Sequence, residues 1–178
     1  MAIGFVACGG KAPPSGAVIE RLSCPPDVPA ELAPARDQDL VFVLHAKGVQ
    51  QYACNGTEWV FVSPSAELFE SEGAKHAGKH SAGPTWEVDR SSVVGAKVTE
   101  IIVAPDAIPW VLLTATSSTG SGRMARVTSI QRLETSGGLA PATGCDADSV
   151  DATTAVKYSA DYYFYETRKS KRNVRCGG

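Results

Sequence analysis

The sequence predicts an all-β fold: a single antiparallel β-sandwich or closed barrel of about seven to nine short strands, with a long N-terminal arm. Two observations support this prediction. The 17 glycines and 11 prolines among 178 residues are typical of a turn-rich chain rather than of long helices. Apolar residues also occur in short runs that turn residues separate. Residues 64–70 and 145–150 could each form one helical turn, which is too short to build a helical layer.

The short apolar runs define eight candidate strands. Asn55-Gly56 separates the second run from the third and predicts a hairpin, because a type I′ turn needs positive φ at both central positions. The last run is the clearest strand, since alternate residues from Val156 to Phe164 share one face. The runs span residues 40–45, 48–53, 57–63, 84–88, 92–103, 107–116, 123–133 and 155–165.

Composition divides the chain into four parts. Residues 1–8 form a candidate remnant of a signal peptide, and six prolines mark residues 9–38 as a tether and extended arm. Residues 39–167 carry the β domain. Residues 168–178 form a basic tail that is either solvated or weakly adhesive toward anionic polymers and headgroups. The formal net charge of −2, without a basic stripe, argues against nucleic acid as a partner.

The cysteines indicate the compartment. None of the five belongs to a C-x-x-C zinc or redox pair, so their wide spacing predicts disulfides. Disulfides persist in oxidising compartments. We therefore expect an extracytoplasmic protein that is lipid-anchored at the cell envelope or secreted. The five residues are Cys8, Cys24, Cys54, Cys145 and Cys176.

Cys8 is a candidate lipidation site. Residues 5–10 resemble the end of a bacterial lipoprotein signal peptide, in which this cysteine would be acylated and become the N-terminus. Seven residues precede Cys8, fewer than a charged region plus an apolar region of ~7–15 residues would need. Two interpretations stay open: a shortened lipoprotein signal, or an ordinary free cysteine in the arm. Membrane contact is expected only through such an anchor.

Several blocks of sequence, taken in order, carry a family resemblance. They are residues 45–54 (HAKGVQQYAC), 59, 64–68, 78–87 (GKHSAGPTWE), 108–113, 130–132, 137–141, 144–145 and 158–165 (YSADYYFY). The series resembles an uncharacterised secreted family of bacteria and fungi, a domain of unknown function whose fungal members are in part labelled malate dehydrogenase. This chain has Ser81 where the family pattern usually has tyrosine, and Asp89-Arg90-Ser91 where it usually has Asp-Gly-Ser.

The resemblance also implies a disulfide pairing. Cys54 and Cys145 lie in the shared blocks, whereas Cys24 and Cys176 lie in the arms. A bridge that the core needs should join the two shared cysteines, which leaves the two arm cysteines for each other.

The sequence contains no convincing match to a catalytic or cofactor-binding motif. The nearest match to a dinucleotide fingerprint, residues 120–125, lies between two β-like runs and favours a hairpin loop, so no cofactor is expected. His76 and His80 are four residues apart, but the intervening residues lack the glutamate and the helix propensity of a zinc motif. No metal site is therefore expected. No nucleophile elbow is present either.

Aromatic residues in the shared blocks form either a core or a ligand cleft, because rings offer apolar faces together with polar edges. Two function classes follow. The first is a non-enzymatic binding or structural surface domain with an unknown small-molecule, glycan or protein partner. The second is an enzyme acting on a small molecule or sugar, in which a pocket containing His80, Trp86 and Glu87 would supply the acid and base. The candidate ligand-binding residues are Tyr52, Trp59, Trp86 and Trp110, and the weak catalytic candidates are His45, His80 and Glu87.

Overall fold

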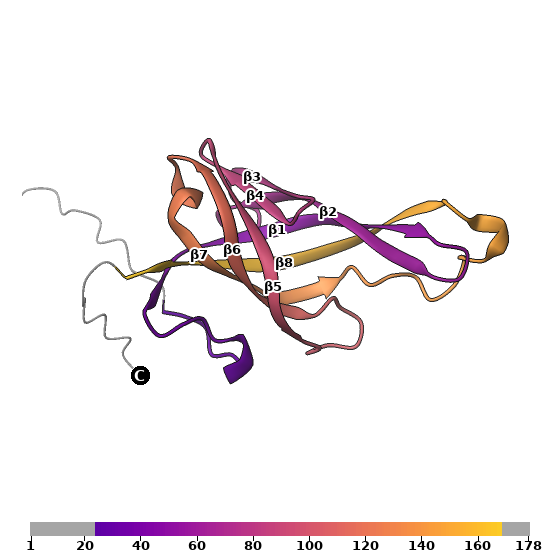
Figure 1. Cartoon of the computed structure of the whole chain (residues 1–178), viewed down its shortest axis with the longest axis horizontal. Coiled ribbons are helices and arrows are strands. Elements are labelled where there is room, and N and C mark those ends of the chain that lie inside the picture. Colours follow the sequence, from indigo (N-terminus) through magenta and orange to yellow (C-terminus); the bar gives the residue numbers. More distant parts are fainter. Residues whose placement is uncertain (1–23, 169–178) are drawn as a thin grey trace, which may run out of the picture.

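The computed structural model of the protein describes residues 24–168, which form eight antiparallel strands in one sheet that closes on itself (Figure 1). Each strand pairs with the next, and β8 pairs with β1 to complete a closed barrel. The predicted all-β class is confirmed. The elements are η1 (Ala30–Leu32), β1 (Gln38–Cys54), β2 (Trp59–Phe69), β3 (His76–Ser81), β4 (Thr85–Val88), β5 (Ser91–Ile101), β6 (Trp110–Gly120), η2 (Arg123–Arg126), β7 (Val127–Gly137), η3 (Ala147–Ser149) and β8 (Thr153–Thr167).

The strands are longer than the apolar runs suggested. The runs 40–45 and 48–53 join into the single 17-residue strand β1, because Ala46 is buried and Lys47 is exposed, so the alternation continues between them. The predicted helical turn at 64–70 is wrong. These residues belong mostly to β2, in which buried and exposed positions alternate through Ala66 and Leu68.

Strand β3 was not predicted from the sequence. Its six residues contain one alanine and no larger aliphatic side chain, so they show no apolar alternation. The strand is held by its neighbours: Gly78 pairs with Leu68 on β2 and with Val88 on β4. A side chain at Gly78 would collide with the backbone carbonyl of Glu87, which makes glycine necessary at this close approach.

The predicted hairpin at Asn55-Gly56 is confirmed, although its loop spans residues 55–58 rather than two residues. The side-chain Oδ1 of Asn55 accepts hydrogen bonds from the backbone N–H groups of Thr57 and Glu58. Gly56 has a φ of 96°, a value that glycine adopts without strain.

One end of the barrel is packed shut. Met124 in η2 is completely buried and joins the main core together with Leu44, Leu68 and Phe164. Next to Met124, the guanidinium of Arg123 lies over the ring of Phe42. The same guanidinium forms ion pairs with Glu70 and Asp89, so the short helix is fastened to two β-hairpins.

The N-terminal arm covers part of the outer wall. Leu32 in η1 is completely buried against Leu112 and Leu133. Its backbone carbonyl accepts a hydrogen bond from Nε2 of Gln131, whose Oε1 accepts one from the hydroxyl of Tyr165. This second cluster is therefore separate from the main core inside the barrel.

Opposite the packed end, the molecule narrows into a projection built from the ends of β1, β2 and β8 (Figure 1). The predicted disulfide between Cys54 and Cys145 is confirmed, with Cα atoms 5.4 Å apart. The predicted helical turn at 145–150 is present as η3. Asp146 and Ser149 form a capping box at its N-terminus. The disulfide and this turn therefore brace the projection.

The remaining cysteine predictions concern the two ends of the chain. Cys24 is disulfide-bonded, but its expected partner Cys176 lies outside the described residues, as does Cys8. That pairing and the lipidation stay predictions. Within residues 24–168 we find no helix with the length and apolar character that a membrane crossing requires.

Candidate ligand-binding cavity

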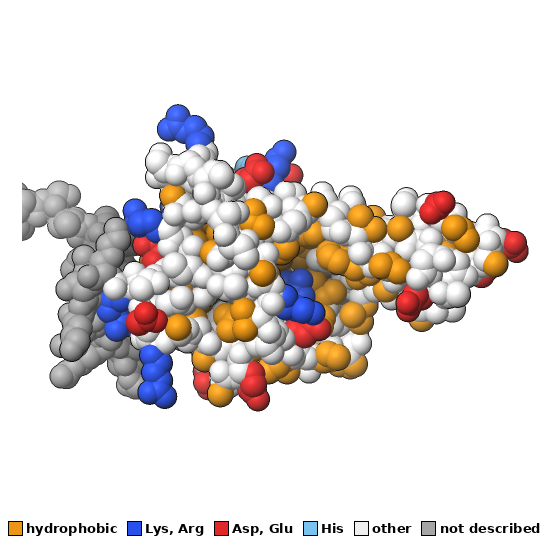
Figure 2. All heavy atoms as spheres, in the orientation of Figure 1, with side chains coloured by type: hydrophobic (Ala, Val, Ile, Leu, Met, Phe, Trp, Pro, Cys, Tyr) orange, Lys and Arg blue, Asp and Glu red, His pale blue; other side chains and the backbone are white. Residues whose placement is uncertain are grey.

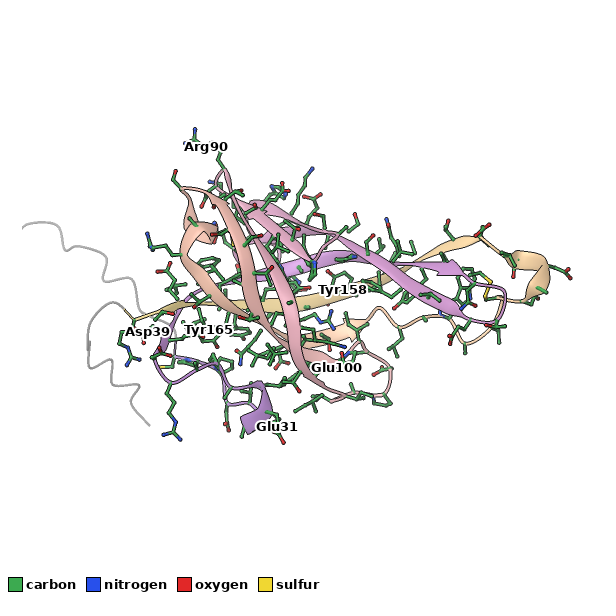
Figure 3. All side chains as sticks on the ribbon, in the orientation of Figure 1. Glu31, Asp39, Arg90, Glu100, Tyr158 and Tyr165 are labelled. Carbon is green, nitrogen blue, oxygen red and sulfur yellow. A yellow bond between two sulfur atoms is a disulfide. The ribbon has the colours of Figure 1, made fainter. Side chains whose placement is uncertain are left out.

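A cavity of about 670 Å³ occupies the end of the barrel that adjoins the projection. This volume is within the range of ~300–1,000 Å³ that small-molecule sites commonly have. All eight strands contribute lining residues, so the site is part of the barrel and not a surface groove. In Figure 3, Tyr158 marks the junction of body and projection, and Glu100 marks the end of β5.

Strand pairing explains which side chains face the cavity. Residues directly opposite one another in neighbouring strands point to the same face of a sheet. Arg132 on β7 is opposite Val111 on β6 and Tyr162 on β8, and all three line the cavity. His80 on β3 is likewise opposite Trp86 on β4.

His80 and Trp86 form one wall of the cavity. Their rings stack with centroids 4.4 Å apart and planes 12° apart, and the ring of Tyr162 meets both edge-on. Gly95 makes room for this wall, because a Cβ at that position would lie 3.1 Å from the Trp86 ring and 3.3 Å from Leu113. The wall therefore presents a flat aromatic surface at a fixed position.

His80 is neutral in the folded protein. Burial lowers its pKa from 6.5 to about 3, with a smaller contribution from the nearby charge of Arg132 and an opposing one from its hydrogen bond to Thr85. Nδ1 lies 2.9 Å from the carbonyl oxygen of Thr85, which can only accept, so Nδ1 carries the proton. Nε2 is consequently left as a hydrogen-bond acceptor.

Arg132 brings a positive charge into the cavity. Its Nε and Nη2 donate to the carbonyl oxygen of Pro109 at 3.1 and 2.9 Å. No carboxylate in the described part of the chain forms an ion pair with this guanidinium. Its charge influences the titration of Tyr52, Tyr158 and Tyr162 as well as that of His80. The guanidinium is thus central to the polar side of the site.

Four buried side-chain groups, three of them on lining residues and one on neighbouring Tyr158, make no well-formed hydrogen bond to the described residues, and all four can donate. The hydroxyls of Tyr158 and Tyr162 interact only weakly with each other, and that of Tyr162 with Arg132. Each of the residues is at most 3% exposed. Burial raises the pKa of Tyr158 and Tyr162, so both phenols keep their protons at neutral pH. Unpartnered buried donors are costly, and their gathering here indicates a missing acceptor. The groups are Nε2 of Gln50, Nε1 of Trp86 and the hydroxyls of Tyr158 and Tyr162.

The mouth of the cavity is apolar. Phe61, Val62 and Leu139 line it while remaining 51%, 57% and 38% exposed. Figure 2 shows hydrophobic side chains gathered where the body meets the projection, with charged side chains beside them. Two of the lining charges at the mouth, Lys97 and Glu100, form an ion pair with each other at 3.1 Å. The entrance therefore combines exposed apolar surface with a neutralised charge pair.

The structure separates the aromatic residues that the sequence grouped together. Tyr52 and Trp86 line the cavity, and the hydroxyl of Tyr52 donates to the carbonyl of Gly138 at 2.6 Å. Trp110 instead packs in the outer cluster under the N-terminal arm. Trp59 is half-buried on the projection, where its Nε1 donates to the carbonyl of Thr143.

The candidate acid and base residues are not brought together. His80 lies in the cavity wall, whereas Glu87, the neighbour of Trp86, is exposed and lines a different surface hollow. His45 pairs with Asp161 at 2.8 Å and lines neither of these two hollows. Among the described residues no group of three or more His, Cys, Asp or Glu side chains could hold a metal ion.

Four residues that shape the site were not among those predicted from the sequence: Gln50, Arg132, Tyr158 and Tyr162. The alternation in β8 did place both tyrosines on one face, and that face is buried as expected. Arg132 follows Ile130 by two residues, so period-two alternation could have placed it on the inner side. A charged residue at an inward position was the available signal.

One family model matches the chain over residues 34–166, and its description is "Protein of unknown function (DUF3455)". The match spans all eight strands and therefore the whole cavity. No curated protein and no solved structure matches the sequence.

Proposed function

The chain belongs to the DUF3455 family, and from the barrel interior we propose that it is a non-enzymatic protein that binds a small, largely apolar molecule. The observation that carries this proposal is the cavity of about 670 Å³ with unpartnered buried donors on its wall. Native proteins rarely leave buried donors unpaired, so an occupant that supplies acceptors accounts for them.

Binding is a better explanation than catalysis because the cavity holds no acid and base pair. A general acid or base works best with a pKa near the operating pH, and His80 titrates far below neutrality. Glu87, which would have been its partner, is on the outer surface. Glu100 at the mouth is occupied by Lys97.

An extracytoplasmic location is part of this proposal. The bridge between Cys54 and Cys145 is the type of bond that persists in an oxidising compartment. A lipid anchor at Cys8 would keep the domain at the cell envelope. Either anchored or secreted, the barrel would present its open end to molecules outside the cytoplasm.

The test uses the neutral fluorescent probe N-phenyl-1-naphthylamine, whose emission increases in apolar surroundings. We expect the wild-type protein to bind this probe and the Leu113→Trp variant to lose most of the binding, because Leu113 points into the cavity. Thr114→Trp is the matched control, since the next residue on β6 is exposed. Circular dichroism verifies that both variants fold.

Two results would contradict the proposal. The first is an absence of probe binding by the wild-type protein. The second is equal binding by the two folded tryptophan variants, which would place the probe somewhere other than in the cavity.

A further inference from the structure

We infer that the natural ligand is an amphipathic carboxylate whose head meets Arg132 inside the barrel and whose apolar part extends toward Phe61 and Val62. This inference rests on the proposed function, since it specifies the chemistry of the molecule that the cavity binds.

The charge on the cavity wall calls for an anion. Of the two basic residues that line the cavity, Lys97 is neutralised by Glu100, while Arg132 donates to the carbonyl of Pro109, interacts with the neutral hydroxyl of Tyr162 and pairs with no carboxylate of the described residues. That contact uses Nε and Nη2, and no carboxylate of the described residues occupies the edge between Nη1 and Nη2. A carboxylate can accept two parallel hydrogen bonds from such an edge.

The neutral groups near this guanidinium also favour an acceptor. Tyr162 lies directly across the strand pair from Arg132, and its hydroxyl makes no well-formed hydrogen bond and interacts only weakly with Arg132 and Tyr158. Tyr158 lies two inward positions along β8, and its hydroxyl and Nε2 of Gln50 on β1 also make no well-formed hydrogen bond. A carboxylate has about four lone-pair directions, so one head group could satisfy several of these donors.

The apolar part of the ligand has a separate place. The stacked rings of His80 and Trp86, together with Leu113, form a wall without charge. Exposed Phe61 and Val62 continue this apolar surface to the mouth. A molecule that is polar at one end and apolar at the other therefore matches the cavity along its length.

The test compares decanoate with 1-decanol, which have chains of the same length and differ in the head group. Each displaces N-phenyl-1-naphthylamine from the wild-type protein at neutral pH. We expect decanoate to act at an at least tenfold lower concentration than the alcohol, because hydrogen bonds to charged groups are the stronger ones. Arg132→Met should remove this preference, while Lys47→Met, which removes a charge from an exposed position on β1, should retain it.

A second variant keeps the inference testable if Arg132→Met does not fold. Tyr158→Phe combined with Tyr162→Phe removes two hydroxyls that make no well-formed hydrogen bond and interact only weakly with each other and with Arg132, so the fold should tolerate it. We expect the decanoate preference to fall at least about fivefold in this double variant.

The outcomes separate the two proposals. If the wild-type protein binds the probe but decanoate and decanol displace it equally well, the carboxylate inference is wrong and the binding function stands. A preference that survives in both the arginine variant and the double tyrosine variant also contradicts the inference. If the wild-type protein binds no probe, the proposed function itself fails.

Discussion

The imidazole of His80 lies parallel to the indole of Trp86, with ring centroids 4.4 Å apart. Two features hold this pair in place: the hydrogen bond from Nδ1 of His80 to Thr85 and the edge of the Tyr162 ring. The pair joins β3 to β4 on the inner side of the barrel, where water has little access. A histidine in this position contributes as an aromatic ring rather than as a charge.

The depressed pKa of His80 predicts a loss of stability in acid. Between pH 6.5 and about pH 3 the unfolded chain binds a proton at this residue that the folded protein does not bind, so the free energy of unfolding falls as the pH falls. From pH 7 to pH 5 the contribution is about 2 kcal/mol. Urea denaturation at pH 7 and pH 5 measures this loss. We expect the free energy of unfolding of His80→Gln to fall less than that of the wild type between these two pH values, by about 2 kcal/mol. His76→Gln is the control, since His76 is exposed, and an unchanged pH dependence in His80→Gln would contradict the prediction.

Three tyrosines on β8 should respond differently to loss of the hydroxyl. Tyr165→Phe removes a 2.5 Å hydrogen bond to Gln131 and leaves the buried amide oxygen unpaired, so the free energy of unfolding should drop by about 1–3 kcal/mol. Tyr158→Phe and Tyr162→Phe remove hydroxyls that make no well-formed hydrogen bond in the described structure. In the unliganded protein these two variants should be as stable as the wild type or up to about 1 kcal/mol more stable. Urea denaturation distinguishes the cases, and equal losses in all three would refute the assignment.

Arg90 is expected to be a site where glycine increases stability. Asp89 and Arg90 form the turn between β4 and β5 with φ values of 50° and 57°. A left-handed conformation costs a non-glycine residue free energy that glycine avoids. Arg90→Gly should raise the free energy of unfolding by about 0.5–1 kcal/mol. Lys79→Gly, at an exposed position in the middle of β3, should lower it, and a loss of stability in both variants would contradict this explanation.

The sequence predicted the parts of the fold that depend on local pattern. Alternation in residues 155–165 identified β8 and its buried face, and Asn55-Gly56 identified a hairpin. The sequence did not reveal β3, because Gly78 and His80 are there for contacts with neighbouring strands and not for an apolar pattern. Whether such a segment forms a strand depends on its pairing with distant segments of the chain.

The candidate site was predicted only in part, for a related reason. Tyr52, His80 and Trp86 were singled out and do line one cavity. Trp110 has the same chemical character but lies on the outer wall, and only the closure of the barrel decides which side of β6 is inside. Arg132 was overlooked because a charged residue normally indicates a solvent-exposed position.

The central claim, that the barrel interior binds a small molecule, is tested most directly by intermolecular nuclear Overhauser effects between N-phenyl-1-naphthylamine and the methyl groups of the protein. We predict contacts to the methyls of Ile108, Val111 and Leu113, which line the cavity. The methyls of Leu32 and Leu112, buried under the arm on the outer wall, should show none. Contacts confined to Leu32, Leu112 or other residues outside the barrel would contradict the account.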